Sequence, residues 1–205
     1  MEDGIYYIVL ADLSNSTVDG AKSGDVVLAM RMKAFCDATK TALKNAQNKI
    51  NSGIFVKSVG DAVLMIFKHF PDVVDWTIEF RGTLHSDNGN LGKFSAKICV
   101  HIGEVLFDSG DPSCVAVSHV FKLEKKVKPG EIVLTETAFR VAHTSMYPKQ
   151  FTFSKNGAIR LPGLSQPLAT YKLVEKSGIG FLIDKTRKGQ HIRARQLPIA
   201  EPRIV

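Results

Sequence analysis

Residues 55–67 read FVKSVGDAVLMIF, two apolar runs that meet at the pair Gly60-Asp61. The β-branched and aromatic residues of these runs favour strands, and glycine tolerates the positive φ that a tight two-residue turn requires. The stretch therefore predicts a β-hairpin in the middle of a sheet, with Asp61 at its tip. A carboxylate gains little packing there and risks desolvation, so we expect a cation to bind it.

Strand and helix patterns alternate along the rest of the chain. The predicted elements are a strand at 5–10, a helix at 25–50 with Met30 and Phe35 on its apolar side, the hairpin, a helix from 71 with Trp76 and Phe80 on its apolar side, a strand at 94–107, a loop with Asp108 and Asp111, a helix at 114–127, a strand at 131–134, a helix at 135–142, a second hairpin turning at Asn156-Gly157, and a last strand at 169–174 that closes the sheet. The βαββαβ order predicts an α/β sandwich of ferredoxin-like type, with helices covering a sheet that contains antiparallel strands.

The size and composition of the chain predict one globular domain. It has 205 residues, 44% of them hydrophobic and 23% charged. No apolar run approaches the roughly 20 residues that span a bilayer, and the N-terminus lacks the basic start of a signal peptide. Three widely spaced cysteines predict neither a disulfide framework nor a zinc site. We therefore expect a cytoplasmic protein without a membrane partner.

Positive charge is concentrated near the C-terminus. The net charge is +7, and much of the excess lies in residues 176–205, which lack a clear period and are predicted to form a basic tail. Residues 1–175 form the predicted domain. The sequence signatures of common nucleic-acid-binding modules are missing, so we expect no nucleic-acid partner.

Two aspartates follow predicted strands: Asp12 ends the first strand, and Asp61 lies in the hairpin turn. If these strands are neighbours, the carboxylates meet and suit Mg²⁺ or Mn²⁺, because these ions also take water and substrate phosphate as ligands. A helix N-terminus attracts phosphate. A polar segment lies where the next helix should begin: Ser14, Asn15, Ser16 and Thr17. Helix capping by Asp12 and a simple turn role for Asp61 are the structural alternatives.

Three stretches together resemble class III nucleotidyl cyclases: IVLADLSNST at 8–17, KSVGDAVLMIF at 57–67 and VSHVFKLEKKVKPGEIVLTETAF at 117–139. The segments VHIGEV at 100–105 and LPGLSQPLATYKL at 161–173 also fit, in the order of the family. The resemblance implies the class III cyclase fold. It also implies the conversion of a nucleoside triphosphate to its 3′,5′-cyclic monophosphate and pyrophosphate.

The resemblance also implies roles for particular residues. Asp12 and Asp61 match the metal-binding aspartates, which together with Leu13 would hold two divalent ions, Mg²⁺ or Mn²⁺. Charge neutralisation at the α-phosphate and in-line positioning would then supply most of the catalysis. Lys57 matches the base-selecting lysine, and Asp111 matches the aspartate that works with it.

The chain departs from the family pattern at three positions. Ser118 stands where the family has a ribose-orienting Asn, and Lys122 stands where it has a transition-state Arg. Lysine can supply charge but not the planar fork that grips two phosphate oxygens. Pro162 replaces a lysine that contacts the distal phosphates, and Arg160 is the candidate to take over that contact. The neighbouring Lys125 and Lys126 are expected to be surface charges.

The family's geometry places the metal aspartates and the base-reading residues on opposite partners. One chain that carries both sets implies a homodimer with two shared active sites. The altered positions 118 and 122 resemble the pyrimidine cyclases of bacterial anti-phage (Pycsar) systems, in which the cyclic nucleotide activates a separate effector. This branch implies UTP, ahead of CTP, as the substrate. An adenylate cyclase and a catalytically inactive nucleotide-binding homologue are the alternatives.

The hydrogen-bonding groups alone leave the base open. A lysine donor beside an aspartate acceptor suits adenine, cytosine and uracil, so the depth of the pocket has to decide. Phe55 and Phe107 are candidates to fill a purine-sized space, with core packing as the alternative for each. Asp108 is a possible substitute for Asp111.

Overall fold

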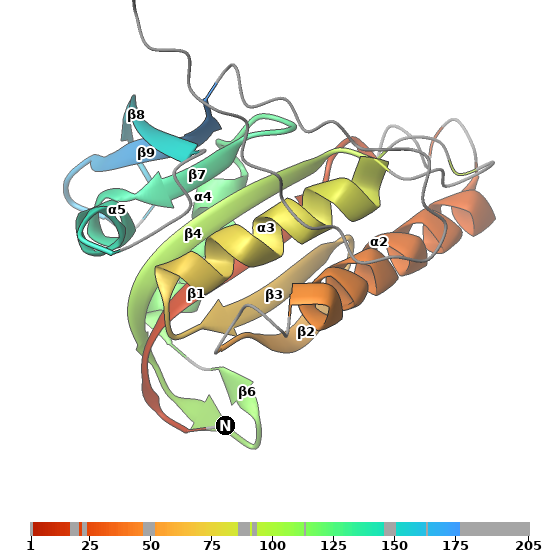
Figure 1. Cartoon of the computed structure of the whole chain (residues 1–205), viewed down its shortest axis with the longest axis horizontal. Coiled ribbons are helices and arrows are strands. Elements are labelled where there is room, and N and C mark those ends of the chain that lie inside the picture. The colour runs from red at the N-terminus through yellow and green to blue at the C-terminus, as the bar shows by residue number, and fades with distance from the viewer. Residues whose placement is uncertain are drawn as a thin grey trace, which may run out of the picture.

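The computed structural model describes residues 2–16, 21, 24–46, 52–85, 91, 94–112, 114–145, 151–162 and 164–176. Its centre is a seven-stranded sheet with the order β2-β3-β1-β4-β7-β9-β8 (Figure 1). The strands are β1 (Gly4–Leu13), β2 (Ile54–Val59), β3 (Ala62–Phe67), β4 (Ala96–Val105), β7 (Ile132–Thr135), β8 (Phe151–Ile159) and β9 (Leu168–Glu175). The helices are α2 (Asp25–Ala46), α3 (Phe70–His85), α4 (Val115–Glu124) and α5 (Glu136–His143), and a small hairpin consists of β5 (Phe107–Asp108) and β6 (Asp111–Pro112).

Helices cover both faces of the sheet. Figure 1 shows α2 and α3 in front of the strands and α4 behind them. Side chains alternate along β1, so that Tyr7 and Val9 pack in the core beneath α2 and α3, whereas Ile8 and Leu10 pack in the core beneath α4. Asp12 continues this second set and therefore belongs to the α4 face of the sheet.

The predicted α/β sandwich with its βαββαβ start is confirmed. Trp76 and Phe80 on α3 are buried and stack with ring centroids 4.8 Å apart, as their helical spacing predicts. On α2, Phe35 is buried, but Met30 is 54% exposed. The prediction of Met30 as a core residue is wrong, because the buried residues of α2 begin only at Phe35.

Four predicted features of the sheet need correction. The β2–β3 hairpin lies at one edge of the sheet rather than in its middle, because β2 pairs only with β3. Asn156-Gly157 is not a turn: Gly157, with φ of 94°, forms a bulge inside the continuous strand β8. The last predicted strand, β9, lies between β7 and β8 and so leaves β8 at the edge. Asp108 and Asp111 face each other in the β5–β6 hairpin instead of lying in a loop.

Two further sequence predictions concern membranes and cysteines. Within the described ranges, no helix is long and apolar enough to cross a bilayer. Cys36, Cys99 and Cys114 are free. The basic tail predicted at 176–205 lies outside the described residues, apart from Lys176.

Candidate active site

The β1–β3 pairing brings the two predicted metal-binding aspartates to one end of the sheet. The strands are antiparallel, with Asp12 opposite Ala62, and the Leu13 amide donates a hydrogen bond to the Asp61 carbonyl over 3.1 Å. The negative charge of Asp61 is close enough to contribute to a raised pKa of Asp12. The convergence that the sequence suggested is therefore present, and it depends on β3, not β2, lying beside β1.

Asp12 is only 8% exposed and shares its surroundings with residues that the sequence analysis missed. Lys97 lies opposite Asp12 on β4, with its Nζ 3.1 Å from Asp12 Oδ2 and 2.5 Å from Oε1 of Glu124, the last residue of α4. Burial raises the pKa of Asp12 to about 6, the hydrogen bond from Lys97 opposes the rise, and the charges of Glu124 and Asp61 add to it. Asp12 and Glu124 therefore share one ammonium group, and the Asp61 carboxylate lies close enough to act on Asp12.

Lys97 keeps its positive charge in this cluster. Burial by itself would lower the pKa of its ammonium group, but the hydrogen bonds to Glu124 and Asp12 outweigh that effect, and its pKa is raised. The only sequence signal for Lys97 was a charged residue within the apolar strand predicted at 94–107. Its partners are 85 and 27 positions away, so periodicity could not have identified them.

The polar segment after β1 divides into residues with different roles. The Ser16 hydroxyl donates a hydrogen bond to Asp61 Oδ2 and so orients that carboxylate. The Ser14 hydroxyl is buried and has no hydrogen-bond partner within the described part of the chain. Asn15 is exposed in the left-handed conformation, with φ of 64°. Thr17, predicted as a phosphate-binding residue, lies outside the described residues.

These residues fit a divalent cation that is completed by substrate. Among the described residues, no cluster of three or more His, Cys, Asp and Glu side chains could hold a metal ion by itself. Mg²⁺ commonly binds through one or two carboxylates and takes waters and substrate phosphates as its other ligands. Two converging aspartates, an excess of carboxylates over ammonium groups and the unpartnered Ser14 hydroxyl match such an open site.

The two predicted base-reading residues also meet. Lys57 Nζ lies 2.5 Å from Asp111 Oδ1. A β-bulge between Phe55 and Lys57 interrupts the alternation of β2, so that Lys57 pairs with Leu64. Because Leu64 packs beneath α4, Lys57 belongs to the same face as Asp12. Asp111 rather than Asp108 contacts Lys57.

The two aromatic candidates for the base pocket lie on opposite faces of the sheet. Phe55 packs against the core beneath α2, where the Lys40 ammonium lies 4.5 Å from its ring centroid. Its proposed role in filling a purine-sized space is therefore wrong, and the alternative of core packing is confirmed. Phe107 packs on the α4 face, edge-on to Tyr6 with the ring centroids 6.2 Å apart. Of the two, only Phe107 shares a face with Lys57.

Helix α4 carries two of the three residues at which the sequence departs from the cyclase pattern that it resembles. Ala116, Val120 and Leu123 are buried against the sheet. Ser118 and Lys122 are half-buried and lie one turn apart on the helix. Close packing of α4 on the sheet is possible because β4 carries a glycine, Gly103, whose added Cβ would lie only 2.7 Å from that of Ala116.

A histidine pair links α4 to β4. His101 is buried, its Nδ1 lies 2.8 Å from the Thr135 hydroxyl, and its Nε2 lies 3.4 Å from Nδ1 of His119 on α4. Burial, and then the neighbouring His119, lower the pKa of His101 to about 4. The ring is therefore neutral at physiological pH and packs between Thr135 and His119.

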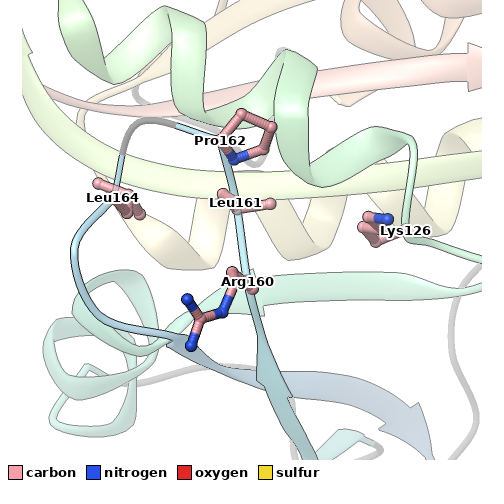
Figure 2. Close-up of a pocket in the computed structure, with 5 residues that line it drawn as sticks. All are labelled: Lys126, Arg160, Leu161, Pro162 and Leu164. Carbon is pink, nitrogen blue, oxygen red and sulfur yellow. The ribbon is translucent and has the colours of Figure 1, made fainter.

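Arg160 lines a pocket of about 410 Å³ together with Lys126, Leu161, Pro162 and Leu164 (Figure 2). Arg160 and Pro162 follow β8, and Lys126 follows α4, so the pocket lies beside the end of the helix that carries Lys122. Both cations are exposed. The structure therefore leaves the Arg160 guanidinium accessible to an anion and places a second positive side chain at the same pocket.

Comparisons with known proteins identify the fold. No family model matches the chain, and no curated protein matches its sequence. Among solved structures, the adenylate/guanylate cyclase/hydrolase from Silicibacter pomeroyi is 18% identical with a TM-score of 0.65, and the match covers 86% of this chain and 100% of that one. The guanylate cyclase domain of RhGC from Catenaria anguillulae, in complex with GTP, is 13% identical with a TM-score of 0.66 and the same two coverages.

A third similar structure is the non-canonical dimeric guanylyl cyclase domain of the RhoGC fusion protein from Blastocladiella emersonii. It is 13% identical with a TM-score of 0.67, and the match covers 85% of this chain and 99% of that one. Matches of this extent at such low identity define an architecture and not a substrate. The chain has the fold of the class III nucleotidyl cyclase catalytic domains.

Proposed function

We propose that the chain is a nucleotidyl cyclase that converts a pyrimidine nucleoside triphosphate, UTP in preference to CTP, to its 3′,5′-cyclic monophosphate and pyrophosphate. The observation that carries the proposal is the convergence of Asp12 and Asp61 at one end of the sheet, within the fold of nucleotidyl cyclases. In the proposed reaction the 3′-oxygen bonds to the α-phosphorus, its proton is lost to solvent, and the bond to the pyrophosphate oxygen breaks.

The residues of the chain would divide the work between them. Divalent ions held by Asp12, Asp61 and Leu13 would supply charge neutralisation and activation of the hydroxyl. Lys122 would place a positive charge near the transferring phosphoryl group, and Ser118 would orient the ribose from the preceding turn of α4. Arg160, which lines the pocket beside α4, would bind the distal phosphates.

Lys57 and Asp111 would select the base. The ammonium group offers only donors and the carboxylate only acceptors, so the pair suits a base edge that places an acceptor beside a donor. Cytosine and adenine present a ring nitrogen beside an amino group, and uracil presents a carbonyl beside N3–H. Guanine is disfavoured because its N1–H would face the lysine. The pyrimidine preference is supported by the resemblance of positions 118 and 122 to the Pycsar branch.

Each active site would be shared between two chains. The metal-binding pair Asp12–Asp61 of one protomer would meet Lys57 and Asp111 of its partner, which gives a homodimer with two equivalent sites. The similar guanylyl cyclase domain from Blastocladiella emersonii is dimeric. We further propose that residues 1–175 form the catalytic domain, that the enzyme acts in the cytoplasm, and that its product activates a separate effector in anti-phage defence.

A direct assay tests this proposal. Purified protein with Mn²⁺ is given ATP, GTP, CTP or UTP separately, and the products are resolved by mass. We expect a 3′,5′-cyclic pyrimidine monophosphate and an equal amount of pyrophosphate. Cyclic AMP alone would make the chain an adenylate cyclase. Binding of a nucleotide without pyrophosphate release would make it a catalytically inactive homologue.

A further inference from the structure

The contact between Lys97 and Asp12 conflicts with the proposed metal site. Lys97 Nζ lies 3.1 Å from Asp12 Oδ2. A divalent cation bound to this carboxylate would lie about 2.1 Å from an oxygen, and the ammonium group would then face it at short range. Because this environment is largely shielded from water, the repulsion would be stronger than between surface charges. A cation bound at Oδ2 would therefore displace the ammonium group from that oxygen.

Glu124 provides the second position for the ammonium group. Its Oε1 already lies 2.5 Å from Lys97 Nζ, and its side chain is 16% exposed, compared with 21% for Lys97. A lysine side chain has a flexible four-carbon stem, so rotation about its single bonds can move the ammonium group from one carboxylate to another without backbone motion. Within the described residues, Lys97 is the only cation within ion-pair distance of either Asp12 or Glu124.

We propose that Lys97 is the resident counter-ion of Asp12, that it competes with a divalent cation for the carboxylate, and that Glu124 receives the ammonium group when the cation binds. This inference rests on the proposed function, because it assumes that Asp12 is a metal ligand. Lys97 lowers the affinity of Asp12 for the cation. Glu124 reduces this loss of affinity, because it binds the ammonium group that the cation displaces. Without a bound cation, the contact stabilises a buried carboxylate that would otherwise be left beside two others.

The first test measures the affinity for Mn²⁺ alone, from the free-ion electron paramagnetic resonance signal, without nucleotide and near pH 8.5. Lys97→Met should bind Mn²⁺ about fivefold more tightly, as expected when a half-buried ion pair no longer competes. Lys97→Arg, which keeps the charge, should remain near the wild type. Lys172→Met is the matched control, because Lys172 forms a comparable partly buried pair with Glu131 at 2.7 Å, and its affinity should not change.

The second test is a double-mutant cycle. It distinguishes movement of the Lys97 ammonium group to Glu124 from a direct effect of the Glu124 charge on the cation. Glu124→Gln should weaken Mn²⁺ binding in the wild-type background and have a clearly smaller effect in Lys97→Met, because Glu124 acts through the lysine. Equal effects in the two backgrounds would overturn the role of Glu124. Unchanged or weaker binding by Lys97→Met would overturn the competition.

Two controls keep these outcomes interpretable. Circular dichroism melting shows whether each variant folds, and Lys97→Gln replaces Lys97→Met in the same comparison if the latter does not. Product formation by the wild-type protein is measured in parallel. If the wild type makes a cyclic nucleotide but the variants leave Mn²⁺ affinity unmoved, only this inference fails. If the wild type neither binds Mn²⁺ nor forms product, the proposed function fails with it.

Discussion

The Lys57 ammonium group lies 2.5 Å from the Asp111 carboxylate, although the two residues are 54 positions apart in the chain. The bulge in edge strand β2 turns Lys57 to the α4 face, and the β5–β6 hairpin extends from the end of β4 to meet it. The side chains are 39% and 60% exposed, so the pair contributes little to stability. An exposed donor–acceptor pair at a fixed position is available to bind a ligand.

Substitution Lys57→Ala should reduce the selectivity between bases. Loss of a hydrogen bond from a charged donor should lower kcat/KM for the preferred nucleotide by about tenfold to 100-fold, and by less for the others. The melting temperature should not change, because the pair is exposed. Steady-state kinetics with all four triphosphates give the measurement. Lys33→Ala, which breaks an exposed pair with Asp37 on α2, is the control, and unaltered discrimination in Lys57→Ala would contradict the assignment.

Substitution at Lys122 tests its role in the transition state. Removal of a charge that acts on the transferring phosphoryl group should lower kcat by about 100-fold or more in Lys122→Met and change KM much less. Lys122→Arg should retain activity, because the guanidinium group supplies the same charge. Lys125→Met removes a neighbouring exposed charge and should behave as the wild type. Equal kcat values for the two methionine variants would rule out a transition-state role for Lys122.

Asp12 should reduce the stability of the protein above neutral pH. Folding raises the pKa of its carboxyl from 3.8 to about 6, because the group is buried beside other carboxylates. The native state therefore binds the carboxyl proton of Asp12 more tightly than the unfolded chain does. As the pH rises from about 4 to about 6, this proton is lost and the free energy of unfolding falls. Asp12→Asn should stabilise the metal-free protein at pH 7.5 by on the order of 1–2 kcal/mol.

Urea unfolding of the wild type and Asp12→Asn between pH 4 and pH 8 measures this difference. The stabilisation should be small at the acid end and grow as the pH rises, until it levels off above pH 7. Asp72→Asn is an informative comparison, because Asp72 is equally buried but accepts hydrogen bonds from Ser52 and should lose stability on substitution. A constant difference across the pH range would contradict the raised pKa of Asp12.

Local sequence patterns predicted the elements and the position of the carboxylates. Asp12 and Asp61 were identified because each follows an apolar run, and the turn at Gly60 joins β2 and β3 as expected. The helical spacing of Trp76 and Phe80 correctly predicted the buried side of α3. These features depend on residues close together in the chain, where periodicity and turn chemistry act.

The remaining features depend on strand order and register. Lys97 and Glu124 could not be assigned to the site, because only the pairing of β1 with β4 places Lys97 opposite Asp12. Glycine with positive φ serves both turns and bulges, so the sequence could not distinguish the bulge at Gly157 from a hairpin. In a regular strand Phe55 and Lys57 would lie on the same face of the sheet. The bulge between them puts Phe55 on the opposite face, so it cannot line a base pocket beside Lys57.

Shared active sites predict complementation between two variants that are each impaired alone. Asp61→Ala lacks a metal ligand and Lys57→Ala lacks a base contact, but one site of the mixed dimer is intact. After exchange of subunits at equal concentrations, about a quarter of wild-type activity should return, since half of the dimers are mixed and each has one good site. Sites contained within single chains would give no recovery. Each variant measured alone gives the baseline.

Cyclic nucleotide formation by Asp61→Asn, measured by mass spectrometry with Mn²⁺ and the preferred triphosphate, tests the role of the carboxylate pair most directly. Asp108→Asn, at the end of strand β5, is the control for loss of an exposed aspartate. The proposed site predicts that Asp61→Asn folds, makes product at least about 100-fold more slowly than the wild type, and binds Mn²⁺ more weakly, whereas Asp108→Asn is unaffected. Wild-type turnover by a folded Asp61→Asn variant would contradict the proposal that Asp12 and Asp61 hold the catalytic cations.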